Sequence, residues 1–129
     1  MIVVDASAIV DLVSEARGAA ELRERLLDDD DLHAPHVIDV EVAAALRRLA
    51  AEGVLSDDRA AVALLDAFDL PILHYPHRAL IERAWELRAH VTIQDGVYIA
   101  LAELLEAPLL TCDERLAQAG GHDATVEVV

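Results

Sequence analysis

The sequence predicts an α/β fold, a three-layer α/β/α sandwich around a central parallel sheet, in a single domain over residues 1–129. Short apolar runs alternate with longer helical patterns, and no internal linker interrupts them. Strands separated by helices are joined by right-handed crossovers, which give a parallel sheet covered on both faces. The chain has 129 residues and is 55% hydrophobic, so it can fill one complete core.

Five strands are expected from short runs of apolar or β-branched residues, over 2–4, 32–34, 70–74, 109–111 and 125–129. The third run carries Pro71 near its start, where strands tolerate proline. The fourth run follows Pro108, which bars extension of the preceding helix. A turn at Gly120 and Gly121 precedes the last strand.

Seven helices are expected between these strands, over 6–13, 19–27, 36–52, 56–68, 77–89, 95–106 and 114–119. Gly18 separates the first two, and Leu22 and Leu26 recur on one face of the second. Pro35 favours the start of the third helix, and Gly53 is suited to follow its end. These helices are long enough to cover both faces of the sheet.

Four acidic residues stand out by their positions: Asp5, Glu41, Asp95 and Asp113. Asp5 and Asp113 follow apolar strands, Asp95 opens an apolar helix, and Glu41 lies on an otherwise apolar helical stripe. Strand-to-helix junctions of a parallel sheet lie along its carboxyl edge, which would gather these carboxylates. Several carboxylates close together need a cation with a preference for oxygen ligands, which indicates Mg²⁺ or Mn²⁺.

Each aspartate also has an alternative interpretation as a helix cap. Asp5 and Asp95 could cap the helices that begin after them. Thr111 and Glu114 fit a capping box around Asp113. Glu41 has no such explanation, because a glutamate on the apolar side of a helix is seldom buried without a partner. The combined pattern therefore favours a metal site.

The four acids lie in segments that resemble the motifs of PIN-domain proteins: Val4 to Ala8, Asp39 to Val42, Gln94 to Ala102, and Thr111 to Leu116. Within that family the chain is most similar to the VapC toxins of bacterial toxin–antitoxin pairs. The similarity runs in order over nearly the whole chain. One position departs from it, because the family often carries Asn three residues after the glutamate and this chain has Ala44.

The resemblance implies a metal-dependent endoribonuclease. Asp5, Asp95 and Asp113 would hold Mg²⁺ or Mn²⁺, and Glu41 would bind the ion directly or through a water. Ser7 and Thr111 lie beside two of these aspartates, where their hydroxyls could orient a carboxylate or a water, although Thr111 could equally be a cap. The resemblance also implies a cognate antitoxin protein as partner, and a homodimer.

The charge of the chain restricts how it could bind RNA. All ten basic residues are arginines and they face twenty-five acidic residues, which gives a net charge of −15. Phosphate contacts dominate affinity for nucleic acids, so a broad RNA-binding surface is excluded. A nuclease that reads one structured target through a few arginines is compatible, and the candidate contacts are Arg17, Arg47, Arg48 and Arg115.

The absence of lysine excludes several other classes. Walker-A nucleotide binding needs a lysine in its loop. Phospho-receivers and haloacid-dehalogenase-type phosphatases, which also carry Asp after the first strand, place a lysine beside that carboxylate. A hypothesis from another class stays open, namely a non-catalytic α/β module that binds a partner protein and uses its acids as caps.

Histidine and cysteine add little chemistry. Two pairs, His33 with His36 and His74 with His77, lie at strand-to-helix junctions and do not match the usual spacing of zinc ligands. Cys112 is the only cysteine, which excludes an internal disulfide and suits a reducing compartment. The N-terminal apolar run is too short for a signal peptide, and no stretch has the length of a membrane span, so a cytoplasmic location is expected.

Overall fold

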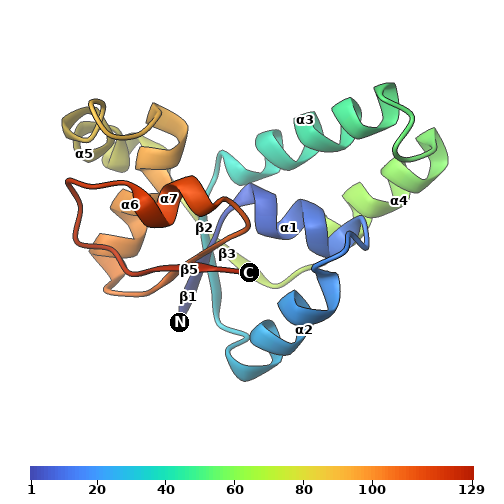
Figure 1. Cartoon of the computed structure of the whole chain (residues 1–129), viewed down its shortest axis with the longest axis horizontal. Helices are drawn as coiled ribbons and strands as arrows, with labels where there is room; N and C mark the ends of the chain where they lie inside the picture. Colours follow the sequence, from blue (N-terminus) through green and yellow to red (C-terminus); the bar gives the residue numbers. More distant parts are fainter.

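A five-stranded parallel sheet forms the middle layer of the computed structural model, which describes residues 1–129 (Figure 1). The strands follow the order β3-β2-β1-β4-β5, so the N-terminal strand is central. All four strand pairings are parallel, which confirms the predicted sheet. The strands are β1 (Ile2–Val4), β2 (Leu32–Pro35), β3 (Ile72–Tyr75), β4 (Leu109–Thr111) and β5 (Val126–Val128).

Helices form the two outer layers, and the α/β/α sandwich is confirmed (Figure 1). One side carries α1 (Ala6–Val13), α2 (Ala19–Asp28), α3 (Ile38–Ala51) and α4 (Asp57–Phe68), with α3 and α4 forming a hairpin that extends away from the sheet. The other side carries the 3₁₀ turn η1 (His77–Leu80), α5 (Ile81–Glu86), α6 (Ile93–Leu105) and α7 (Glu114–Gln118). No helix is both long and apolar enough to cross a membrane.

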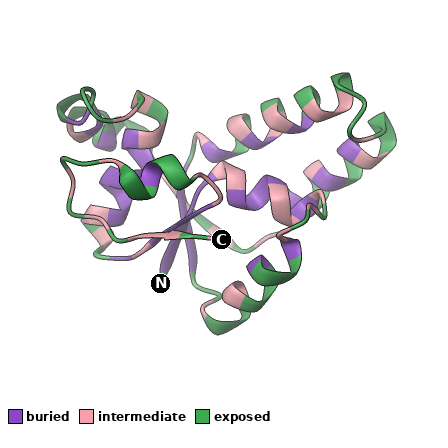
Figure 2. Ribbon diagram, in the orientation of Figure 1, coloured by how far each residue is buried: buried purple, intermediate pink, exposed green.

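The core runs through the centre of the sheet (Figure 2). All three residues of β1 are completely buried, because β2 and β4 flank this strand and helices cover both of its faces. On α6 an unbroken buried run extends from Gly96 to Ala102. The central strand and α6 are therefore rigidly held. Asp5 directly follows this strand, and Asp95 lies in the first turn of α6.

Two expected helix starts are wrong. The sixth helix begins at Ile93 rather than at Asp95, because Thr92 is its N-cap and accepts a hydrogen bond from the amide of Asp95. The third begins at Ile38, because the ladder between β2 and β3 continues through Pro35 to His36, whose N–H donates to Tyr75 O at 2.7 Å.

Two further boundaries differ from expectation. The segment expected as one helix over 77–89 is divided into η1 and the short α5, which ends at Glu86. The third strand begins at Ile72, after Pro71, which lacks the N–H that a strand ladder requires. Neither difference moves an acidic residue away from the carboxyl edge.

Candidate active site

The structure places the four acids at the carboxyl edge of the sheet. Asp5 directly follows β1 and Asp113 follows β4 by two residues, and these strands are parallel neighbours. Asp95 lies in the first turn of α6, and Glu41 lies in the first turn of α3. Parallel strands and the helices that follow them direct their junctions to one edge, so residues far apart in sequence lie together.

Asp5 is only 6% exposed, and three hydrogen-bond donors satisfy its buried carboxylate. Its Oδ1 accepts from Ser7 Oγ at 2.6 Å and from the Ala8 amide at 3.0 Å, and its Oδ2 accepts from Thr111 Oγ1 at 2.5 Å. Burial raises the pKa of Asp5, and these hydrogen bonds oppose the rise. Asp5 is the N-cap of α1, as its alternative interpretation proposed, but capping uses only one of its contacts.

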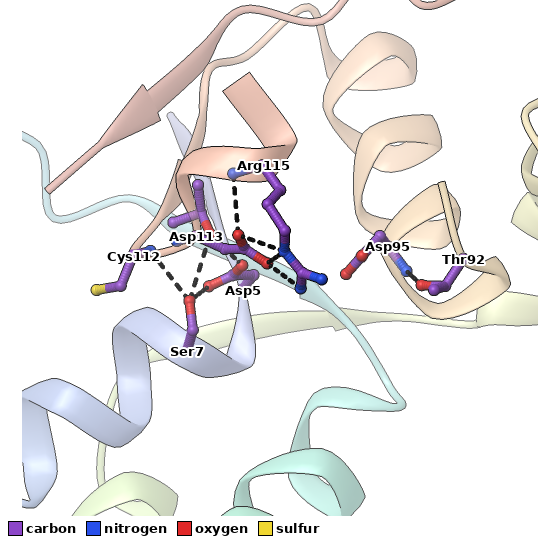
Figure 3. Close-up of polar contacts among 8 residues, drawn as sticks. Asp5, Ser7, Thr92, Asp95, Cys112, Asp113 and Arg115 are labelled. Atoms are coloured by element: carbon purple, nitrogen blue, oxygen red, sulfur yellow. Dashed lines mark hydrogen bonds and ion pairs between the residues drawn. The ribbon is translucent and has the colours of Figure 1, made fainter. Parts of the chain in front are cut away.

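Ser7 and Thr111 connect Asp5 to the loop that carries Asp113 (Figure 3). Ser7 Oγ accepts from the Cys112 amide at 3.0 Å, and Thr111 Oγ1 accepts from the Asp113 amide at 3.0 Å. Thr111 is completely buried. The two hydroxyls therefore fix the carboxylate of Asp5 and the backbone that leads to Asp113 as one unit.

Glu41 receives a hydrogen bond from a residue that was not among the predicted site residues. The hydroxyl of Tyr98 donates to Glu41 Oε1 at 3.0 Å. Tyr98 lies three residues after Asp95 on the same helix, and this spacing is the signal that could have indicated the contact. Burial raises the pKa of Glu41, and the charges of Asp95 and Asp5 raise it further.

Asp95 is half-buried and its carboxylate faces the end of Arg115 (Figure 3). Burial raises its pKa, the charge of Asp113 adds to the rise, and Arg115 opposes it. Because Thr92 is the cap of α6, the side chain of Asp95 is not used as an N-cap. The cap interpretation is therefore wrong for Asp95.

Asp113 is paired with Arg115 (Figure 3). Arg115 Nη2 lies 2.7 Å from Asp113 Oδ2, and Arg115 Nε lies 3.0 Å from Oδ1. This pairing lowers the pKa of Asp113. Asp113 is also the N-cap of α7, so the capping box expected with Thr111 as the cap is wrong. Thr111 ends β4 and uses its hydroxyl on Asp5.

The four carboxylates influence one another electrostatically. The charge of Asp95 raises the pKa of both Asp5 and Glu41, and the charge of Asp113 raises that of Asp95. The acids thus form one electrostatic cluster.

The cluster is not a preformed cation cage, because no three side chains of His, Cys, Asp or Glu are arranged to hold an ion. Its donors nevertheless suit Mg²⁺ or Mn²⁺, since they are all carboxylate oxygens and carry like charges that a cation would offset.

Arginines flank the acids on two sides. Arg48 lines a hollow of about 360 Å³ with Ser7, Asp11 and Glu41. A second hollow, of about 460 Å³, is lined by Asp95, Arg115 and Arg88. Arg88 was missed from the sequence, and it lies over the ring of Trp85 with 4.6 Å from Cζ to the ring centroid. Arg17 and Arg47 are exposed and line neither hollow.

One histidine of each pair, His33 and His74, is hydrogen-bonded through its ring. His33 is buried, with Nδ1 2.7 Å from Tyr75 Oη and Nε2 2.9 Å from Asp31 Oδ1. His74 contacts Asp39 at 3.1 Å. Both rings thus have structural partners.

Comparison with known proteins identifies the class that this fold and acidic edge define. The sequence profile of the PIN domain matches residues 2–121. Ribonuclease VapC12 from Mycobacterium tuberculosis is 42% identical over 129 residues, covering 100% of this chain and 99% of its own. The chain therefore belongs to the PIN-domain family and, within it, to the VapC ribonucleases.

Solved structures share the fold at lower identity. PAE2754 from Pyrobaculum aerophilum superposes with a TM-score of 0.72 at 23% identity, over 98% of this chain and 83% of that one. VapBC2 from Rickettsia felis, solved with a DNA fragment from its promoter, gives a TM-score of 0.69 at 14% identity, over 99% and 98% of the two chains.

Proposed function

We propose that this protein is a Mg²⁺- or Mn²⁺-dependent endoribonuclease that acts as the toxin of a toxin–antitoxin pair. Its membership of the VapC ribonucleases supports the reaction class. The observation that carries the metal dependence is the gathering of Asp5, Glu41, Asp95 and Asp113 at the carboxyl edge of the sheet, where the charge of Asp95 adds to burial in raising the pKa values of Asp5 and Glu41. A cluster of this kind is stabilised by a bound cation.

In this proposal Asp5, Asp95 and Asp113 hold the ion, and Glu41 binds it directly or through a water. When bound, such an ion would supply a water of lowered pKa and offset charge on the phosphodiester. Ser7 and Thr111 keep the Asp5 carboxylate in one orientation through hydrogen bonds to both of its oxygens. That fixed orientation reduces the reorganisation needed when the reaction begins.

Substrate binding falls to the arginines beside the acids. Arg48 and Arg88 line the two hollows that adjoin Glu41 and Asp95, and Arg115 lies between Asp95 and Asp113. A guanidinium donates several hydrogen bonds in a fork that matches phosphate oxygens. Arg17 and Arg47 are more remote candidates. With a net charge of −15, the protein binds RNA only where these few arginines meet a matching structure.

The proposed partner is a cognate antitoxin with a basic, flexible segment. An acidic edge on a chain of net charge −15 attracts such a segment, and an arginine inserted among the carboxylates forms charge-assisted hydrogen bonds. Arg115 and Asp113 provide an internal example of this geometry. The inserted arginine competes with Mg²⁺ for the same oxygens. A homodimer completes the proposed assembly.

The alternative is a non-catalytic module whose acids are caps. Asp5 and Asp113 do cap helices, which favours it, whereas Glu41 and Asp95 do not. Thermal denaturation with EDTA and with Mn²⁺ separates the two ideas, because an ion that binds only the folded state raises the melting temperature. An unchanged melting temperature at millimolar Mn²⁺ supports the module.

Sequencing of RNA ends after induced expression, without the neighbouring gene, tests the reaction itself. Wild-type protein is expected to produce new ends at a small number of sites, and Asp95→Asn is expected to produce none. If both proteins are folded and produce the same RNA ends, the acidic cluster is not the site of a ribonuclease reaction.

A further inference from the structure

Tyr98 occupies an unusual position for a core aromatic residue. Its side chain is 1% exposed, yet its hydroxyl reaches Glu41 Oε1 on a different helix at 3.0 Å. Glu41 makes no other side-chain hydrogen bond within the protein. The orientation of this carboxylate therefore depends on one donor, which lies 57 residues away in sequence.

The position of Tyr98 is fixed by the packing of α6. Tyr98 and Asp95 are three residues apart on α6, so one side of this helix faces the acidic cluster with both residues. The next residue after Asp95 is Gly96, and a Cβ at that position would lie 3.0 Å from Ala84 Cα. Close packing of α6 against α5 thus fixes the rotation of α6, and with it the place of the Tyr98 hydroxyl.

The hydroxyl remains a donor at neutral pH. An ordinary phenol has a pKa of about 10, so it keeps its proton at neutral pH. A phenol that keeps its proton can satisfy only one oxygen of the carboxylate. The second oxygen, Oε2, has no hydrogen bond within the protein and is free to take another ligand.

We infer that Tyr98 is a positioning residue of the active site, which fixes Glu41 so that Oε2 can bind the catalytic ion or its water. This role rests on the proposed metal-dependent reaction. Residues that hydrogen-bond to metal ligands typically change metal affinity or activity by about 10- to 100-fold when they are replaced. Tyr98 would act through Glu41 and would not touch the RNA.

The test compares Tyr98→Phe with Tyr75→Phe. Phenylalanine fills the same core space and removes only the hydroxyl. Tyr75 is a matched control, because its hydroxyl also has a side-chain partner, His33, but none of the four acids. Mn²⁺ affinity is measured by titration calorimetry, and RNA cleavage is measured as kcat and KM.

Tyr98→Phe is expected to weaken Mn²⁺ binding about tenfold and to lower kcat, with KM for RNA unchanged. Tyr75→Phe is expected to match the wild type in both measurements. In a protein that already carries Glu41→Gln, Tyr98→Phe is expected to have no further effect on Mn²⁺ affinity. The effects of two replacements do not add when the two residues act through one contact.

Two results would overturn the positioning role. One is Mn²⁺ affinity of Tyr98→Phe within twofold of wild type. The other is an equal loss of affinity on the wild-type and Glu41→Gln backgrounds, which would show that Tyr98 acts independently of Glu41. Wild-type protein that neither binds Mn²⁺ nor cleaves RNA would instead overturn the proposed function, and the role of Tyr98 with it.

Discussion

Arg115 holds both carboxylate oxygens of Asp113, with Nη2 2.7 Å from Oδ2 and Nε 3.0 Å from Oδ1. The arginine side chain is 85% exposed, so water screens the pair and its contribution is small. It nevertheless places a positive charge where the proposed ion would bind. The chain therefore carries its own weak competitor for the metal.

Replacement of Arg115 by Gln is expected to raise Mn²⁺ affinity by about two- to fivefold, the range typical of an exposed ion pair. Cleavage is expected to fall at the same time, because the proposed phosphate contact is lost. Calorimetry and single-turnover assays measure the two effects. Arg78→Gln is the control, since Arg78 is exposed and forms no ion pair. Unchanged metal affinity in Arg115→Gln would contradict the competition.

Asp95→Asn is expected to lower RNA cleavage by at least roughly 100-fold, more than loss of a supporting residue alone. The metal-free variant should be no less stable than wild type, because one of several repelling charges is removed. Thermal denaturation in EDTA measures stability. An unfolded variant would show that Asp95 is needed structurally.

Thr111→Val is expected to destabilise the fold by about 1–3 kcal/mol, the cost of leaving a buried polar group without its partner. Thr111 is completely buried and donates to Asp5, so the isosteric change removes a hydrogen bond and leaves the volume filled. Urea denaturation measures the loss. Thr125→Val, at an exposed position, is the control and should be neutral.

The stability of the metal-free protein should depend on pH through the acidic cluster. Folding raises the pKa values of Asp5, Glu41 and Asp95 above their ordinary values of 3.8, 4.5 and 3.8. The folded state therefore binds more protons than the unfolded state just above pH 4, and stability falls as pH rises through the raised pKa values.

The pKa of Asp113 is lowered, so Asp113 makes stability rise with pH and opposes the other three acids. The contribution of Asp95 is therefore measured as the difference between a variant and the wild type. The melting temperature of Asp95→Asn minus that of wild type, both in EDTA, should increase as pH rises from about 4. Saturating Mn²⁺ should remove the decline in the wild type. A difference that is constant with pH would show that Asp95 titrates normally.

Inhibition by the antitoxin should weaken as Mg²⁺ increases, because both compete for the carboxylates. Co-purification with the protein encoded by the neighbouring gene, followed by cleavage assays over a series of Mg²⁺ concentrations, measures this. Equal inhibition at every concentration would mean that the partner covers a face remote from the acids.

The fold was predictable because strands and helices alternate and because glycine and proline residues mark many of the boundaries between them. All five strands and the order of the helices follow from apolar runs and from residues such as Gly53, whose φ of 75° suits a helix end. Helix starts were harder, since Thr92 and Asp95 are equally good caps by residue type and only the hydrogen bond distinguishes them.

The positions of the four acids were also predictable, because parallel topology alone directs them to one edge. Their partners were not. The Tyr98–Glu41 contact joins two helices, and the Arg115–Asp113 pair is local but depends on the directions of two side chains, which sequence spacing does not determine.

The hydroxyl links between Asp5 and the loop after β4 join residues 104 to 106 positions apart. During synthesis the chain emerges from its N-terminus, so Asp5 leaves the ribosome long before Thr111 and Asp113 do. Until then the central strand β1 lacks its neighbour β4, and Asp5 lacks one of its three donors, the Thr111 hydroxyl. A nascent chain without residues 109–129 therefore has neither β4 nor Asp113, and the acidic edge is complete only when translation is nearly finished.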